Sequence, residues 1–256
     1  MARLSVHLLP DLVDESELAG KTVVVIDVLR ATTTITYALA AGAAQVIPCL
    51  EIEDARRTAA EFPRDQVLLG GERGGVRIEG FDLGNSPEEY SPEIVRGKSI
   101  VFTTTNGTRA MMRCRQAKRV LIGAVVNLSA VADAVRDEEN VHLVCAGTEG
   151  QVSCEDTLLA GVLVAKPRRG ISGLAVNDAA QLAEGAFRAL MAVGASPAEF
   201  TVRKLHEALK LGLGGRNVLA LGRDQDLLAA AQIDKFDFVP ELDLADWSIR
   251  RPSPAR

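Results

Sequence analysis

The sequence predicts an α/β protein: a layered sheet with helices on both faces, followed by a helical C-terminal half. Short runs rich in Val and Ile are apolar at consecutive positions, which is typical of strands covered on both faces. Segments with the apolar spacing of helices lie between many of these runs, as in proteins that layer helices on a sheet. From about Cys154 onward the chain becomes rich in Ala and Leu.

The expected elements follow from these patterns in chain order. We expect strands at residues 4–8, 22–26, 45–49, 67–69, 99–102, 119–122 and 141–145. Between them we expect helices at 51–61 and 128–136, the second capped by Asn127. The C-terminal helices are expected at 154–164, 177–193, 197–210 and 224–231. Residues 70–91 are rich in Gly and charge, which predicts a long loop with room for a hairpin.

No linker rich in Pro, Gly and Ser divides the chain, so we expect one domain over residues 1–256, with a frayed tail after about Trp247. The net charge of −5 argues against nucleic-acid and anionic-membrane partners, although a few arginines can still bind a small anion. We see no secretion signal, no apolar stretch of ~20 residues and no CxxC pair. A reduced, cytoplasmic protein is therefore expected, and a homo-oligomer stays open.

Two polar loops follow expected strands and begin expected helices. Asp27 and Arg30 follow the run VVVI, and this pairing suits a metal-plus-phosphate site, or else a surface ion pair. The second loop is TTTNGTRA, which contains Thr104, Thr105, Asn106 and Gly107. Backbone N–H groups at a helix start favour anions, so this loop is either an anion cradle or a capped helix start.

A third loop, CAGTEGQVSCEDTLLAG, adds the adjacent acids Glu155 and Asp156 at a helix start, where acids can also simply complement the helix dipole. Cys145 precedes this loop and is either a nucleophile or a small core residue. Two known phosphatase patterns are absent. Leu29 stands where a haloacid-dehalogenase-type enzyme needs its second Asp, and Gln151 stands where a cysteine phosphatase built on Cys145 would need Arg.

The chain resembles the 2-phosphosulfolactate phosphatase family in an ordered set of blocks: VIDVLRATTT, GERGG, GFDLGNSP, TTTNGTRA, CAGTEGQVSCEDTLLAG and GGRNVLALGRDQDL. The resemblance runs from Asp27 to about Glu241. It implies a Mg²⁺-dependent phosphatase with its own α/β fold. The implied reaction converts (2R)-O-phospho-3-sulfolactate to (2R)-3-sulfolactate and phosphate, a step toward coenzyme M in methanogens.

The resemblance also gives the conspicuous charged residues an expected role. The arginines in or beside the blocks are candidates for binding the anionic substrate: Arg30, Arg77, Arg109 and Arg216. The acids in the blocks are candidate Mg²⁺ ligands: Asp27, Glu72, Glu155 and Asp156. The nucleophile stays open between a water molecule, Asp27 and Cys145. Two alternatives are a phosphatase for another small phosphorylated 2-hydroxy acid and a non-catalytic anion-binding protein.

Overall fold

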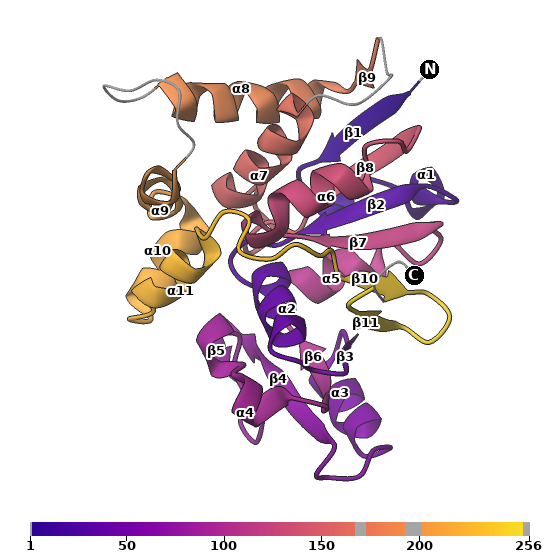
Figure 1. The fold of residues 1–256 in the computed structure, drawn as a ribbon, viewed down its shortest axis with the longest axis vertical. Helices are drawn as coiled ribbons and strands as arrows, with labels where there is room; N and C mark the ends of the chain where they lie inside the picture. Colours follow the sequence, from indigo (N-terminus) through magenta and orange to yellow (C-terminus); the bar gives the residue numbers. More distant parts are fainter. Residues whose placement is uncertain (1, 167–172, 193–200, 253–256) are drawn as a thin grey trace.

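The fold is built on one mixed sheet, seen in the computed structural model, which describes residues 2–166, 173–192 and 201–252 (Figure 1). Within these residues the sheet has eleven strands in the order β5-β4-β6-β3-β11-β10-β7-β2-β8-β1-β9. The strands are β1 (Arg3–His7), β2 (Thr22–Ile26), β3 (Gln45–Pro48), β4 (Val67–Arg73), β5 (Val76–Arg77), β6 (Ser99–Thr103), β7 (Arg119–Gly123), β8 (Asn140–Cys145), β9 (Ala175–Val176), β10 (Glu241–Asp243) and β11 (Ser248–Arg250). The strands expected from consecutive apolar runs are all present.

The sheet consists of two parallel blocks joined by an antiparallel hairpin. One block contains β4, β6 and β3, and the other contains β7, β2, β8 and β1. The hairpin β10–β11 lies between them, because β10 pairs with β7 and β11 pairs with β3 through Ile249 and Val46. In Figure 1 the β3–β6 block forms the lower part of the molecule and the other block the upper part.

The expectation of a frayed tail after Trp247 is therefore wrong for the residues that follow directly. Ser248–Arg250 is strand β11, and Ile249 is fully buried between the two blocks. A three-residue strand flanked by arginines carries too short an apolar pattern to be read from sequence, and only its two partners make it a strand. The last residues, 253–256, lie outside the described residues.

Helices cover both faces of the sheet, as predicted. They are α1 (Glu15–Leu18), α2 (Ala31–Ala40), α3 (Ile52–Ala59), α4 (Pro92–Val95), α5 (Gly107–Met112), α6 (Leu128–Ala134), α7 (Cys154–Ala165), α8 (Asp178–Ala192), α9 (Val202–Leu209), α10 (Leu213–Ala220) and α11 (Asp224–Ala230). Strand β2 shows the layering, since Val24 and Ile26 pack in the core with α6 and α7. Val23 and Val25 pack in the opposite core with α2 and α5.

The C-terminal part contains several helices, but it also contains β9, β10 and β11, so it is less uniformly helical than expected. The helix expected at 197–210 is described only from Val202, because residues 193–200 lie outside the described residues. Asn127 precedes α6 as expected, yet its side chain does not cap that helix. Its amide instead bonds to Ala124 N, Ile122 O and Phe238 O.

The segment expected to be a loop at residues 70–91 contains the predicted hairpin. Strand β4 extends to Arg73 and turns through Gly74 and Gly75, both at positive φ, into β5. Short 3-10 turns occur at Pro10–Leu12, Pro87–Glu89 and Val125–Asn127.

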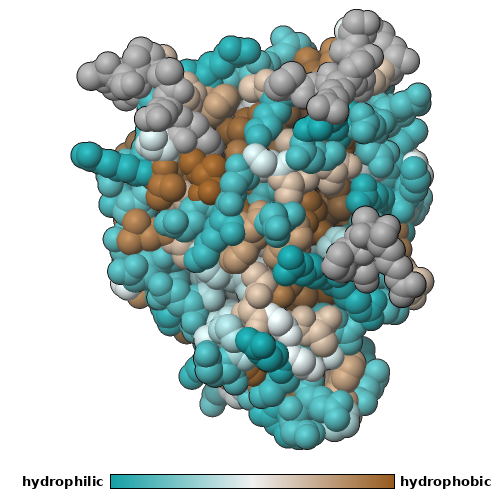
Figure 2. Space-filling view, viewed as in Figure 1, coloured by the Kyte–Doolittle hydropathy of each residue, from teal (hydrophilic) through white to brown (hydrophobic). Residues whose placement is uncertain are grey.

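Hydrophilic residues cover most of the lower block in Figure 2, and hydrophobic residues show mainly over the upper part. No helix in the described part of the chain has the length and apolarity needed to cross a membrane.

Candidate active site

A cavity of about 280 Å³ lies where the carboxyl ends of both parallel blocks meet. Its wall combines the loop after β2, the β4–β5 turn, the loop between β6 and α5, the loop between β8 and α7, and helix α10. Loops at the carboxyl ends of parallel strands form the ligand crevice in open α/β sheets. The sequence-predicted residues that line the cavity are Asp27, Arg30, Glu72, Thr105 and Asn106.

Asp27 is the buried acid at the centre of this site. It directly follows β2 and is 5% exposed. One of its carboxylate oxygens accepts a hydrogen bond from Ala31 N at 3.2 Å. Burial, together with the nearby charges of Glu72 and Glu155, raises the pKa of Asp27 to about 7. This carboxyl can therefore hold or release a proton near neutral pH.

Gly107 allows the loop TTTNGTRA to lie directly against Asp27. A β-carbon placed at Gly107 would meet the Ala31 side chain at 2.5 Å and Asp27 Oδ2 at 2.7 Å, so any larger residue would push the carboxylate away. Thr104 is buried, and its hydroxyl and carbonyl bond to Thr108. The structure therefore requires glycine here for close approach of two loops.

The predicted anion cradle already faces an internal anion. Glu72 reaches from the end of β4 and accepts a hydrogen bond from Thr105 N at 2.8 Å. Its other oxygen accepts from Gly75 N at 2.6 Å and from the Thr105 hydroxyl at 3.3 Å. The Thr105 N–H is thus used within the protein. Glu72 fixes the relative position of the β4–β5 turn and the loop after β6.

Glu155 and Asp156 lie behind the cavity wall and differ in how well their oxygens are bonded. Asp156 accepts hydrogen bonds from Val28 N at 2.9 Å and Gly147 N at 3.0 Å, so it ties together the loops after β2 and β8. Glu155 is 2% exposed, and its Oε2 has no hydrogen-bond partner among the described residues. Burial raises the pKa of both acids, and for Asp156 the charges of Asp27 and Glu155 add to this rise.

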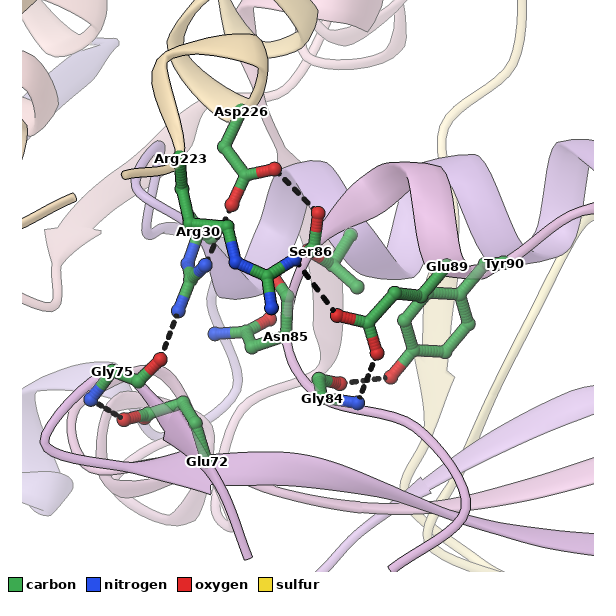
Figure 3. A network of polar contacts seen from close by, with 11 residues as sticks. Arg30, Glu72, Gly75, Gly84, Asn85, Ser86, Glu89, Tyr90, Arg223 and Asp226 are labelled. Carbon is green, nitrogen blue, oxygen red and sulfur yellow. Dashed lines mark hydrogen bonds and ion pairs between the residues drawn. The ribbon is translucent and has the colours of Figure 1, made fainter. Parts of the chain in front are cut away.

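Among the described residues that line the cavity, Arg30 is the one basic side chain. It is anchored from both sides (Figure 3). Its Nη1 forms a buried ion pair with Asp226 of α11 at 2.6 Å, and its Nη2 donates to Gly75 O at 2.8 Å. Asp226 also accepts a hydrogen bond from the Ser86 hydroxyl. The guanidinium is therefore held in one orientation by two separate segments, and Ser86 from a third segment holds the carboxylate that pairs with it.

The other predicted arginines are exposed and do not line this cavity. Arg77 donates to Asp82 O, and Arg216 donates to Leu211 O within its own region of the chain. Arg109 lies on the exposed side of α5. The structure thus brings Arg30 to the site and leaves these three outside the wall.

Cys145 lies in the core of β8 with no exposed surface. Burial and the charges of Asp156 and Glu155 raise the pKa of this thiol well above its ordinary value. A nucleophilic cysteine needs the opposite environment, with exposure and a lowered pKa. The structure therefore gives Cys145 the alternative role, that of a small core residue.

Sequence reasoning missed several residues of the cavity wall. Asn85 and Asn217 line it, and Asn217 donates a hydrogen bond to Glu149 at 3.0 Å. Glu149 lines the wall at a positive φ of 54°, a conformation that is rare for residues other than glycine and clusters at functional sites. Asn85 and Asn217 lie within the blocks GFDLGNSP and GGRNVLALGRDQDL, which could have indicated them.

The acids of the site fit a divalent cation of the kind that binds few protein ligands. No three His, Cys, Asp or Glu side chains in the described ranges form a preformed metal centre. Mg²⁺ commonly uses one or two carboxylates, with water and substrate oxygens completing its shell. Glu155 Oε2 is a buried carboxylate oxygen that the described residues leave without a hydrogen-bond partner, so it is available to a cation. One or two of the acids Asp27, Glu72 and Glu155 could hold the cation.

Comparisons with known proteins agree with the motif pattern. The family model described as 2-phosphosulpholactate phosphatase matches residues 7–244. A probable 2-phosphosulfolactate phosphatase of Caldanaerobacter subterraneus subsp. tengcongensis is 41% identical over 231 residues, covering 90% of this chain and 91% of the relative. Proteins of the same description from Symbiobacterium thermophilum and Thermotoga petrophila are 43% and 40% identical over 228 and 222 residues. These cover 88% and 87% of this chain, and 92% and 89% of the relatives.

Proposed function

The chain belongs to the 2-phosphosulfolactate phosphatase family, and from this premise we propose that it hydrolyses 2-phosphosulfolactate to sulfolactate and inorganic phosphate in a Mg²⁺-dependent reaction. The (2R) form is the substrate that the family resemblance implies. The reaction is carried out in one domain, and the protein is cytoplasmic.

The observation that carries this proposal is the excess of buried acid at the cavity. Asp27 and Glu72 line the cavity and Glu155 lies directly behind its wall. Against these acids, Arg30 is the one cationic side chain among the described lining residues. Arg30 is itself paired with Asp226. A substrate with phosphate, carboxylate and sulfonate groups would be repelled by these acids. A divalent cation between acids and phosphate removes that repulsion, which is what a metal-dependent phosphatase requires and a simple anion binder does not.

Each residue of the site has a role that follows from its position. Asp27 lies in the wall of the cavity, where its carboxylate could hold the cation or accept a proton from the attacking water. Arg30 presents its remaining N–H groups to an anionic oxygen from a fixed orientation. Glu72 and Asp156 hold the loops that place these groups. When bound, Mg²⁺ supplies charge neutralisation for the transferring phosphoryl group.

The test is phosphate release by the purified protein after removal of divalent cations with EDTA. We expect release from 2-phosphosulfolactate to stop and to return when Mg²⁺ is added. Phospholactate and phosphoglycerate serve as competing substrates, because they represent other small phosphorylated hydroxy acids. Faster turnover of one of these would assign the site to a different substrate. No turnover of any ester, with retained phosphate binding, would make the protein an anion binder.

A further inference from the structure

Asn85 lies in the cavity wall with a side-chain amide to which no other described residue forms a hydrogen bond. The residue stands between β5 and the turn Pro87–Glu89, and it is 5% exposed. No described residue forms a hydrogen bond with its buried Oδ1, and none accepts one from its Nδ2, which is the donor that an anionic ligand could use. Amide groups of residues this buried are nearly always hydrogen-bonded in folded proteins, so an unused Nδ2 donor at a cavity points to a ligand that accepts hydrogen bonds.

The backbone around Asn85 is held rigidly by its neighbours (Figure 3). Gly84 N donates to Glu89 at 2.6 Å, and Gly84 O accepts from the Tyr90 hydroxyl at 2.6 Å. The carbonyl of Asn85 itself accepts a hydrogen bond from the Thr34 hydroxyl at 2.9 Å. The loop therefore keeps its shape without the Asn85 amide, which is left free to contact a molecule in the cavity.

The cavity wall has two chemically different ends. Asp27 lies against Gly107, and Glu155 lies beside Thr148 and near the charge of Asp27, which makes one acidic end. Asn85 belongs to the other end, where Ser86 and Arg30 share the carboxylate of Asp226. Figure 3 shows Asn85 and Arg30 close together in this network. A ligand with its phosphate at the acidic end would extend its other acid groups toward Arg30 and Asn85.

We propose that Asn85, beside Arg30, binds the sulfonate of the substrate and so makes the enzyme select sulfonated esters. This inference rests on the proposed function. The sulfonate is one carbon further from the ester oxygen than the carboxylate is, so it reaches further from the acidic end. Its three oxygens can accept hydrogen bonds from a guanidinium and an amide at the same time. Asn85 is thus a specificity residue, and Asp27 carries the chemistry.

The test compares three esters with the wild type and with Asn85→Ala. The esters are 2-phosphosulfolactate, 2-phospholactate, which lacks the sulfonate, and 2-sulfoethyl phosphate, which lacks the carboxylate. We expect Asn85→Ala to lose about 10- to 100-fold in kcat/KM for the two sulfonated esters, mainly through KM. The value for 2-phospholactate should change by less than about 3-fold, because the lost hydrogen bond is absent there.

Asn85→Asp provides a second variant of the same shape. Its negative charge should lower kcat/KM for the sulfonated esters at least as much as Asn85→Ala does. The melting temperatures of both variants should stay near the wild-type value. An equal loss on all three esters, or a loss confined to the two esters with a carboxylate, would overturn the sulfonate assignment alone. A wild type that releases phosphate from none of the three would instead overturn the proposed function, and the inference with it.

Discussion

The two ends of the cavity use buried charge in opposite ways. Around Arg30 the charges are paired, since Asp226 meets the guanidinium at 2.6 Å with side-chain exposures of 5% and 1%. Around Asp27 the acids Glu72 and Glu155 outnumber the nearby cation Arg30, and a buried oxygen of Glu155 has no hydrogen-bond partner in the described structure. Paired buried groups hold segments in place, whereas unpaired ones store unfavourable energy that a ligand can relieve. The first end therefore holds the loops and Arg30 in position to bind a substrate, and the second end holds the acids proposed for the chemistry.

The largest effect should come from breaking the paired end. Asp226→Ala leaves the Arg30 guanidinium buried without its counter-charge, and we expect a loss of about 3–5 kcal/mol in the free energy of unfolding. Asp54 is a matched control, because it meets Arg57 at the same 2.6 Å on the surface. Asp54→Ala should cost less than about 1 kcal/mol. Urea unfolding measures both, and equal losses would show that burial does not distinguish the two pairs.

The pH dependence of stability tests the unpaired end. Asp27 has a folded pKa of about 7 against an ordinary value of 3.8, so the folded state retains a proton that the unfolded chain releases. Without divalent cations, stability should therefore fall as pH rises from about 4 to about 7, by at most about 4 kcal/mol from this group. In Asp27→Asn, the loss of stability between these pH values should be smaller than in the wild type. A stability that rises over this range in the wild type would contradict the raised pKa.

Asp27→Asn also separates chemistry from architecture. We expect kcat/KM for phosphate release to fall by at least about 100-fold, on the scale of losing a metal ligand or proton carrier. The melting temperature should stay constant or rise, because the substitution removes a buried charge. Near-normal turnover in the folded variant would remove Asp27 from the reaction.

Cys145→Ser should have the smallest effect on activity. The thiol lies in the core without access to the cavity, so kcat should change by less than about 3-fold. A hydroxyl without partners in this core should lower the melting temperature instead, consistent with a cost of about 1–3 kcal/mol. A folded variant with no activity, and a phosphocysteine trapped on the wild type, would restore the thiolate mechanism.

Local patterns in the sequence predicted the layered sheet and the three loops that meet at the site. Strand β2 and its Asp27 are examples, because an apolar run followed by a polar turn is visible in one stretch of chain. Ile249 was missed because its burial depends on two strands far away in sequence. The pairing of Arg30 with Asp226 spans 196 positions, and no local spacing encodes it.

The predicted site arginines show the same limit of sequence reasoning, because here residues were predicted for the site that the structure leaves outside it. Arg77, Arg109 and Arg216 lie in or beside the matching blocks, yet their side chains are exposed and outside the cavity wall. Position in a motif places a backbone near a site, but the orientation of a long side chain depends on packing around it. Asn85 was overlooked because asparagine beside glycine reads as a turn, and its unused amide is visible only in three dimensions.

The unpaired acids Asp27 and Glu155 are the proposed binding place of a cation. The most direct measurement is the melting temperature of the wild type and of Glu155→Gln at about pH 8, each with EDTA and with Mg²⁺. Glutamine keeps the shape of Glu155 but removes its charge, so the variant should fold as well as the wild type. We predict that Mg²⁺ raises the melting temperature of the wild type and has a clearly smaller effect on Glu155→Gln. An equal rise in both proteins, or none in either, would contradict the claim.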